Sequence, residues 1–428
     1  MGPLPSAIRV LSLLCLCAIG PGAAWAAAPD SSLAARAVNS LGLRLLARTG
    51  AAPANALISP YSIQNALAMT WTGADGATWR EMGRVLDFGT NESALHASFS
   101  ALGSSLDQLR QRTETLAAEG QKHGQPFDPV SLVVANRLFG EKSFAFRPDF
   151  IERTRVHYGA ALEPLDFLGH ADAARLTINR WVSGQTRDRI QDLIPPDALS
   201  PDTRLILVNA IYMKAPWQVP FEPALTRPER FHVTDATPQM TPTMTARKHF
   251  GYRRDKGFSA ITLPYLGDDL QFLILLPDAL TGLAAVERSL TPQVLADCAR
   301  LPRAELELHL PKLHLQPPVM NLGKTLKGLG MTTAFDEPPG SANFGRMAPK
   351  GPGADLKISE VFHKTFLDLD EQGTEAAAAT AVAMAPTAAP VTPKPKPILV
   401  RVDHPFLFAV QHRTSGACLF IGRLVNPR

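Results

Sequence analysis

Residues 371–385 read Glu-Gln-Gly-Thr-Glu-Ala-Ala-Ala-Ala-Thr-Ala-Val-Ala-Met-Ala, and this stretch is the most informative part of the chain. From Gly373 to Ala385 it contains no proline, so every backbone N–H is free to join a sheet. Its side chains are nearly all small, so alternate ones could be buried beneath a sheet without clashes. On propensity alone the alanines would form a short helix, but strand-like sequence on both sides favours a functional loop over a linker. The stretch could therefore be a loop in one state and a strand in another.

The N-terminal third of the chain is predicted to be mainly helical. Hydrophobic spacing and helix-start signals indicate helices at 33–45, from Ser59-Pro60 through Met69, at 148–158 and at 172–190. Ser59 suits the N-cap position and Pro60 the first helical position. Residues 115–128 interrupt this pattern and are predicted to form an exposed loop or an insertion.

Strands are predicted over most of the later two-thirds. The apolar run 205–213 is typical of a strand covered on both faces, and 306–310 alternates like a half-exposed strand. Two hairpins are expected, one joining 261–263 to 270–276 and one joining 406–410 to 418–424. No internal repeat and no Gly- or Ser-rich linker divides the chain.

Residues 1–26 are interpreted as a secretory signal peptide. Arg9 supplies the positive charge, residues 10–19 form the apolar stretch, and Ala24-Trp25-Ala26 is a cleavage site of the A-x-A type. The apolar stretch is shorter than the roughly 20 residues that a membrane span needs. We expect a secreted protein, extracellular or periplasmic, without a membrane anchor.

Charge and cysteine content exclude some classes of partner. The formal net charge is +4, and no concentrated basic face that would bind nucleic acid stands out. Cys15 and Cys17 would leave with the signal peptide. For Cys298 and Cys418 we prefer two buried free thiols to a disulfide, since nothing in the sequence shows that they meet.

Residues 371–380 resemble the hinge of inhibitory members of the serpin family. Five other segments are similar to signatures of that family: 55–63 (Asn-Ala-Leu-Ile-Ser-Pro-Tyr-Ser-Ile), 209–217 (Asn-Ala-Ile-Tyr-Met-Lys-Ala-Pro-Trp) with Phe221 after it, 310–313 (Leu-Pro-Lys-Leu), 403–408 (Asp-His-Pro-Phe-Leu-Phe) and 420–427 (Phe-Ile-Gly-Arg-Leu-Val-Asn-Pro). All six occur in family order, and the resemblance runs from about residue 33 to the C-terminus.

The resemblance implies one α+β domain over residues 27–428, with three β-sheets, about nine helices and an exposed reactive loop at about 371–400. It also implies a mechanism in which a target serine protease attacks the loop and forms an acyl-enzyme through its own serine. The cut loop then inserts into the central sheet as an extra strand. A monomer is expected, with no cofactor, no metal, and a covalently bound protease as the partner.

The resemblance assigns roles to individual residues. The hinge comprises Gly373, Thr374, Glu375, Ala376, Ala377, Ala378, Ala379 and Thr380. A polar cluster where the sheet must open comprises Ser59, Ser62, Asn209 and His363, and the top of the sheet carries Trp217, Lys312 and Glu371. Family spacing places the scissile bond at Thr387-Ala388, with Met384-Ala385 as the runner-up, and small residues there favour elastase-like or subtilisin-like proteases.

Two other functions are weighed against inhibition. A hydrolase is disfavoured because the chain contains no G-x-S-x-G elbow and no H-E-x-x-H helix. A non-inhibitory serpin that acts as a carrier or chaperone is the stronger alternative. The small, uncharged residues at 374, 376 and 378 argue for the inhibitor, because a charge or a proline at those positions would slow insertion. A glycosaminoglycan site is not predicted, since the basic residues Arg110, Arg112, Lys122 and His123 are too sparse.

Overall fold

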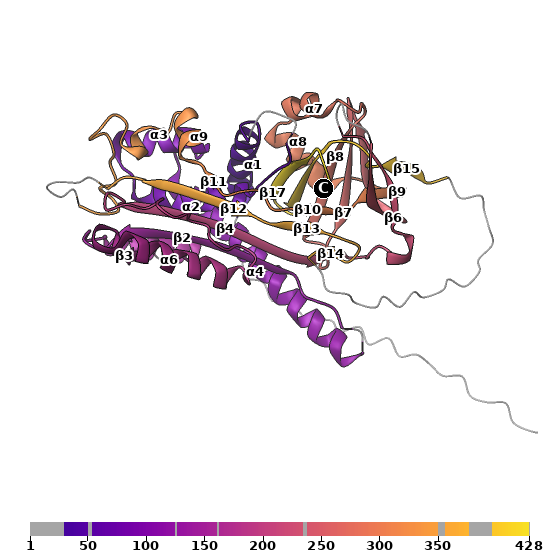
Figure 1. Ribbon diagram of the computed structural model, residues 1–428, viewed down its shortest axis with the longest axis horizontal. Helices are drawn as coiled ribbons and strands as arrows, with labels where there is room; N and C mark the ends of the chain where they lie inside the picture. The colour runs from indigo at the N-terminus through magenta and orange to yellow at the C-terminus, as the bar shows by residue number, and fades with distance from the viewer. Residues whose placement is uncertain are drawn as a thin grey trace, which may run out of the picture.

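The computed structural model describes residues 30–49, 54–124, 126–160, 162–233, 238–349, 356–375 and 396–427. The predicted signal peptide, the hinge residues from Ala376 to Thr380 and both predicted scissile bonds lie outside these ranges. Figure 1 shows helices and sheets combined in one α+β body.

The described residues form nine α-helices and 17 strands. The helices are α1 (Ser32–Leu46), α2 (Pro60–Gly73), α3 (Gly76–Leu86), α4 (Glu92–Lys122), α5 (Pro148–Tyr158), α6 (Phe167–Gln185), α7 (Leu283–Ser289), α8 (Pro292–Asp297) and α9 (Gly323–Gly328). The strands are β1 (Ala56–Ile58), β2 (Ser131–Glu141), β3 (Glu163–Leu165), β4 (Leu205–Pro216), β5 (Arg227–Phe231), β6 (Gln239–Asp255), β7 (Phe258–Pro264), β8 (Leu270–Pro277), β9 (Arg303–Pro311), β10 (Leu313–Leu315), β11 (Met320–Asn321), β12 (Glu360–Thr365), β13 (Leu367–Leu369), β14 (Gly373–Thr374), β15 (Ile398–Arg401), β16 (Phe406–His412) and β17 (Cys418–Leu424).

Hydrogen bonds connect nine of the strands in the order β1-β17-β16-β8-β7-β6-β9-β15, with β5 also on β6. The long strand β6 joins two parts of this network. Its first residues pair with β5, its last residues with β7, and the residues between them with β9. The resemblance implies three sheets, whereas by hydrogen bonding the described strands form two, this one of nine strands and a central sheet of eight.

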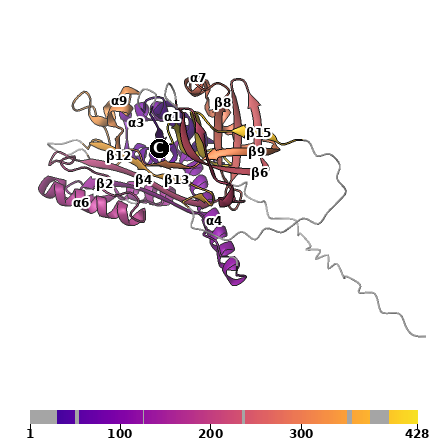
Figure 2. The ribbon, with the colours of Figure 1, turned by 45° about the vertical axis from the view of Figure 1, so that its right-hand side comes forward.

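The central sheet contains the other eight strands, and β4 lies in the middle of it, paired with strands on both sides. On one edge β4 pairs antiparallel with β2, from Ser131 to Gly140. On the other edge it pairs parallel with β12 and then antiparallel with β14. Figures 1 and 2 show α6 lying along one face of this sheet, over β2 and β4. The even-numbered residues of β4 pack toward α6, and the odd-numbered apolar ones pack into the main core.

The predicted helices and strands form, with shifted ends. The Ser59 side chain caps α2 by accepting from the Ser62 N–H, and α5 has the predicted bounds, Pro148 to Tyr158. The helix predicted at 172–190 instead runs from Phe167 to Gln185 with a kink at His170, and Asp166 caps its start by accepting from the Gly169 N–H. Both predicted hairpins form, as β7–β8 and β16–β17.

The predicted loop at 115–128 is wrong for most of that segment, while the alternative of an insertion stays a prediction. Residues 115–122 continue α4, a helix of 31 residues that begins at Glu92 and ends at Lys122. Leu, Ala, Glu, Gln and Lys dominate these positions and are strong helix formers, and one glycine near the end does not break the helix. The segment is exposed as predicted, since this part of α4 extends beyond the sheets (Figures 1 and 2).

The cysteine prediction is confirmed, because Cys298 and Cys418 are both buried and free. Burial raises the pKa of the Cys298 thiol to about 11, so it remains protonated at neutral pH. Within the described ranges, no helix combines the length and the apolar character needed to cross a membrane.

Candidate functional site

The loop that follows residue 370 starts inside the central sheet. The short strand β14, Gly373 and Thr374, lies between β13 and β4. Gly373 pairs with Pro216 and Thr374 with Ala215 of β4, while Thr374 also pairs with Leu369 of β13. The first two hinge residues thus already occupy a strand position between β4 and the strand that follows β12.

Gly373 fits this position because it has no side chain. Its φ is +147°, a conformation that L side chains rarely adopt. A Cβ added there would lie 2.2 Å from the carbonyl oxygen of Ala215 and 2.6 Å from the Cα of Pro216. Both contacts are to backbone that cannot move aside, so β14 can approach β4 only with glycine at this position.

Thr374 contacts a buried aromatic pair, Tyr265 and Trp217, on the core side of the sheet. Its side chain has no solvent exposure, and its hydroxyl lies 2.7 Å from the hydroxyl of Tyr265. The Tyr265 ring stacks on Trp217 at 4.6 Å between centroids, and the Trp217 indole N–H donates to the carbonyl of Asp370. Burial raises the pKa of Tyr265, so its hydroxyl stays protonated and able to donate. The hinge is therefore attached to the core through side chains as well as backbone.

Glu375 is the last described residue before the central part of the loop. It has a positive φ of +49°, which is uncommon for a residue other than glycine. Its side chain is only 11% exposed and forms an ion pair with Arg189, which follows α6. The Arg189 guanidinium also lies 5.7 Å from the centre of the Phe366 ring. These contacts place Glu375 on the face of the sheet that α6 covers, opposite the face of Thr374.

Trp217, Lys312 and Glu371, predicted for the top of the sheet, lie close together. The ammonium of Lys312 is 2.7 Å from one carboxylate oxygen of Glu371, and the Thr226 hydroxyl donates to the other. The Glu371 carbonyl accepts from the backbone N–H of Phe221, near Trp217. Burial raises the pKa of Glu371, but the hydrogen bonds from Lys312 and Thr226 outweigh it and leave the pKa below its ordinary value. Glu371 is therefore ionised at neutral pH.

The polar cluster under the centre of the sheet is also brought together. Ser59 donates its hydroxyl to the carbonyl of Leu419, and its backbone N–H donates to Nε2 of His363. Ser62 donates to the side-chain oxygen of Asn136, whose amide group donates back to the Ser62 carbonyl. Asn136 was not predicted from the sequence, although a polar residue within a strand that is otherwise largely apolar is a signal that could have identified it.

Asn209 and His363 stand level with Asn136 across three neighbouring strands. In the register of the sheet, Asn209 of β4 pairs with Asn136 of β2 on one side and with His363 of β12 on the other. Asn209 is buried, and neither atom of its side-chain amide has a hydrogen-bond partner among the described residues. Burial lowers the pKa of His363 to about 3, so the imidazole is neutral at physiological pH and accepts from Ser59. The boundary between β4 and β12 at this level carries no side-chain hydrogen bond from Asn209.

The described residues show no arrangement suited to metal binding, since no group of three or more His, Cys, Asp or Glu side chains could hold an ion.

The order of the strands determines where a longer β14 would have to lie. The loop leaves the sheet at β14 and re-enters the fold at β15, which pairs with β9 in the other network. A strand-shaped continuation of β14 would have to separate β12 from β4.

Comparison with known proteins identifies the family. Residues 36–427 match the family model described as serpin, serine protease inhibitor. The chain is a serpin. It therefore belongs to a family whose description names the inhibition of proteases and not catalysis.

Relatives of this serpin include named protease inhibitors. It is 34% identical to antithrombin-III of Ovis aries over 379 residues, which cover 87% of this chain and 76% of the relative. It is 38% identical to the leukocyte elastase inhibitor of Bos taurus over 383 residues, covering 87% of this chain and 93% of the relative.

Solved structures with the same fold include ovalbumin, a thermophilic serpin and thyroxine-binding globulin. Uncleaved ovalbumin matches with a TM-score of 0.75 at 26% identity, over 93% of this chain and all of that one. Native tengpin, a thermophilic serpin, matches with a TM-score of 0.76 at 26% identity, over 91% and 93% of the two chains. Human thyroxine-binding globulin, solved with its hormone, matches with a TM-score of 0.73 at 25% identity, over 93% and 98%.

Sequence reasoning missed two contacts of the serpin's hinge and one of Glu371, at the top of the sheet. Tyr265 under Thr374, Arg189 beside Glu375 and Thr226 beside Glu371 come from segments far away in the sequence. None of the three residues lies in a motif that singles it out. Their role depends on which strands and turns meet at the top of the sheet, which only the tertiary structure decides.

Proposed function

We propose that this serpin is a secreted inhibitor of serine proteases that acts as a suicide substrate. A target protease cleaves the loop between β14 and β15 and becomes linked to it through the acyl group. The loop then inserts between β4 and β12 before the acyl-enzyme can be hydrolysed. The single observation that supports this proposal best is the pairing of Gly373 and Thr374 with β4, because it supplies the first step of the new strand.

The register of β14 fits the length of the small-residue stretch. If the antiparallel pairing with β4 continues, Met384 comes to lie opposite Leu205, the first residue of that strand. The first proline of the loop, Pro386, then falls beyond the end of β4. Every residue that has to donate to the sheet ladder can therefore do so.

The faces of the inserted strand would also match its two surroundings. Side chains alternate between faces in a strand, so the face shared with Thr374 would carry Ala376, Ala378, Thr380, Val382 and Met384. None of them is charged, and they would lie against the core side of the sheet, where Thr374 already lies buried. The only charge, on Glu375, would remain on the other face beside Arg189.

Secretion and target class are part of the same proposal. Residues 1–26 would be removed on export, leaving a single domain from residue 27 to residue 428. Thr387-Ala388 remains the proposed scissile bond, with Met384-Ala385 second. Both suit proteases that accept small or linear side chains, of the elastase or subtilisin type.

A mixing experiment tests the proposal. The protein is incubated with pancreatic elastase or subtilisin, and the products are resolved on a denaturing gel and by mass spectrometry. We expect a band that survives SDS, with the mass of both proteins joined, and a released C-terminal fragment that begins at Ala388. Cleavage without such a band would contradict inhibition and favour a carrier or chaperone.

The carrier alternative has one supporting observation, the likeness to thyroxine-binding globulin, a protein solved with bound hormone. It predicts cleavage of the loop as an ordinary substrate, without a covalent complex. The hinge chemistry described above favours inhibition over this alternative.

A further inference from the structure

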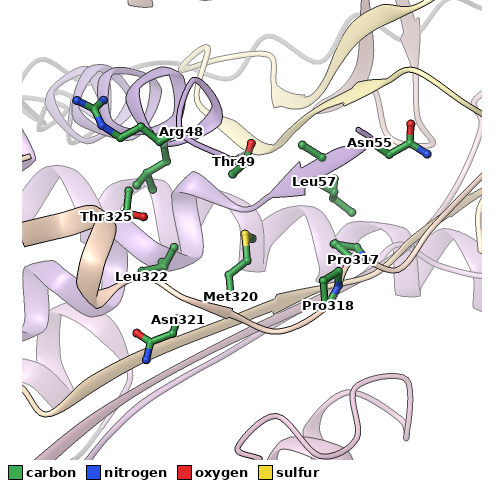
Figure 3. A pocket seen from close by; sticks show the side chains of 12 residues that line it. Arg48, Thr49, Asn55, Leu57, Pro317, Pro318, Met320, Asn321, Leu322 and Thr325 are labelled. Carbon is green, nitrogen blue, oxygen red and sulfur yellow. The ribbon is translucent and has the colours of Figure 1, made fainter. Parts of the chain in front are cut away.

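A pocket lies between α1, β1 and the segment that leads into α9 (Figure 3). Its volume is about 320 Å³, and twelve residues line it. An apolar cavity of about 150 Å³ accommodates one benzene molecule, so this space suits a ligand of about a dozen non-hydrogen atoms. Leu45 and Leu57 come from α1 and β1, and Met320 and Leu322 come from β11 and the residue after it.

The body of the pocket is apolar and one wall is rigid. Pro317 and Pro318 form part of that wall, and proline fixes the backbone φ. In Figure 3 the Met320 side chain rises from β11 into the middle of the space. A flexible, polarisable thioether adapts to ligands of different shape. The pocket thus resembles ligand sites in having apolar walls and few polar groups.

Most polar groups of the lining already have partners. The Asn55 side chain bonds to the backbone of Val425 and Asn426. The Asn321 side chain bonds to Glu360 and to the N–H of Gly323. The side chains of Asn55 and Asn321 already form hydrogen bonds within the protein, so they are not available to a ligand.

Two polar groups remain available at one end of the pocket. Arg48 is the only charged residue of the lining, and its guanidinium makes one hydrogen bond, to the carbonyl of Arg44, and no ion pair with any described residue. The Thr325 hydroxyl has no partner in the described part of the chain. Figure 3 shows both side chains at the same end in that view. A planar guanidinium and a hydroxyl that line the same pocket suit a carboxylate.

We propose that this pocket binds a small apolar carboxylic acid as its anion. The hydrocarbon part lies among Leu45, Leu57, Met320 and Leu322, and the carboxylate accepts from Arg48 and Thr325. None of the residues that line the site belongs to the loop, and its ligand is not a protease.

The pocket is connected to the place where the sheet must open. Met320 of β11 pairs with His363 of β12, and the carbonyl of Leu57 accepts from the hydroxyl of Thr365, also in β12. A ligand that touches both Met320 and the α1–β1 wall would resist a shift of β11 and β12 relative to α1 and β1. Bound carboxylate would therefore slow insertion of the loop, a consequence that rests on the proposed function.

Decanoate is the probe for this site. The full chain is labelled with ¹³C at methionine methyl groups, and the Met320 signal is assigned with the variant Met320→Leu. We expect one saturable shift of Met320 on titration with decanoate, and an affinity for decylamine, the cation of the same chain length, that is about tenfold weaker.

Arg48, in the turn after α1, and Arg44, in α1 itself, give a matched pair of variants. Arg48 is exposed and Arg44 is half-buried. Arg48→Gln should weaken decanoate binding about tenfold, because the charged partner of the carboxylate is lost. Arg44→Gln lies one turn away, does not line the pocket and should leave binding unchanged. An unmoved Met320 signal, or equal affinity of Arg48→Gln and the native chain for decanoate, would overturn the site.

The link to inhibition has its own readout. We expect saturating decanoate to slow formation of the SDS-stable complex in the native chain and to have much less effect on Arg48→Gln. If decanoate binds and the rate does not change, the coupling is wrong and the binding site stands. If no complex forms with any protease while Met320 still responds, the proposed function fails and the site is unaffected.

Discussion

At Gly373 the chain passes so close to β4 that a side chain has no room. The Cβ of any other residue would lie within 3 Å of three backbone atoms of β4 and the residue after it. The positive φ adds strain for residues other than glycine. The hinge therefore depends at this position on backbone geometry and not on a side-chain contact.

Replacing Gly373 by alanine should detach β14 from β4. We expect a loss of about 1–3 kcal/mol in the free energy of unfolding, as for other strained backbone positions. Urea titration followed by far-UV circular dichroism measures it. Gly184→Ala is the matched control, because nothing lies within 4 Å of a Cβ at this helical position, and the variant should be unchanged or slightly more stable. Equal stability of the two variants would contradict the assignment.

His363 determines how the centre of the sheet responds to acid. Its pKa is about 3 in the folded protein, against an ordinary value of 6.5 for histidine, so the unfolded chain takes up the proton more readily. The contribution of the neutral imidazole is complete above pH 6.5 and is lost as the pH falls from 6.5 toward 3. At pH 5 the loss from this residue amounts to about 2 kcal/mol.

We therefore predict that the urea midpoint of the native protein falls between pH 7 and pH 5 more steeply than that of His363→Gln. Glutamine can still accept from the Ser59 N–H but does not titrate, so comparison of the two slopes isolates His363 from the other histidines. The variant will be less stable at pH 7, and that difference is expected. Parallel slopes would show that His363 does not protonate on unfolding.

At the scale of elements, the central sheet is built with a place for one more strand. The ladder between β4 and β12 is parallel for six residue pairs and gives way to β14 at its end. Insertion of the small-residue stretch would replace a parallel pairing by two antiparallel ones, which are slightly more stable per residue. The faces of that strand differ, since one faces the core side and the other lies on the α6 side.

A pair of loop variants tests those faces. Ala378→Glu would place a carboxylate on the core side of the inserted strand, where an unpaired charge costs several kcal/mol. We expect the loop to be cleaved normally, while the yield of SDS-stable complex falls more than about tenfold. Ala377→Glu carries the same change one position earlier, on the face of Glu375, and should retain most of the yield. The reverse order of the two yields would refute the proposed register of insertion.

At the scale of the whole molecule, cleavage of the loop should raise stability. Residues 376–385 would add about ten backbone hydrogen bonds to the sheet, each worth about 1 kcal/mol net. For a chain of this size the midpoint of thermal unfolding should then rise by about 10 °C or more. Circular dichroism before and after limited proteolysis measures it. A midpoint that does not rise after cleavage is the outcome expected of a relative that does not insert its loop.

The order of elements could be read from the chain because local rules govern it. The Ser59-Pro60 start of α2, the proline start of α5 and the hairpin β16–β17 follow from capping, fixed φ and alternation. The α4 extension was missed because glycine and proline near residues 119–126 suggested a loop, while the helix formers around Gly120 were strong enough to continue the helix. The start of α6 differs from its predicted position for another reason, which is that Asp166 caps the helix five residues earlier than its hydrophobic pattern indicated.

By itself the sequence determined the family, the proline-free stretch of small residues and the identity of the polar groups that could meet beneath a sheet. Only the tertiary structure decided that Gly373 and Thr374 already lie in the sheet, that Tyr265, Arg189 and Asn136 hold the hinge and the polar cluster, and that Arg48 has no ion-pair partner in the described part of the chain. The physical reason is that composition and periodicity are properties of neighbours in sequence. Close approach of two backbones, burial of a histidine and pairing of distant charges depend on which strands lie side by side.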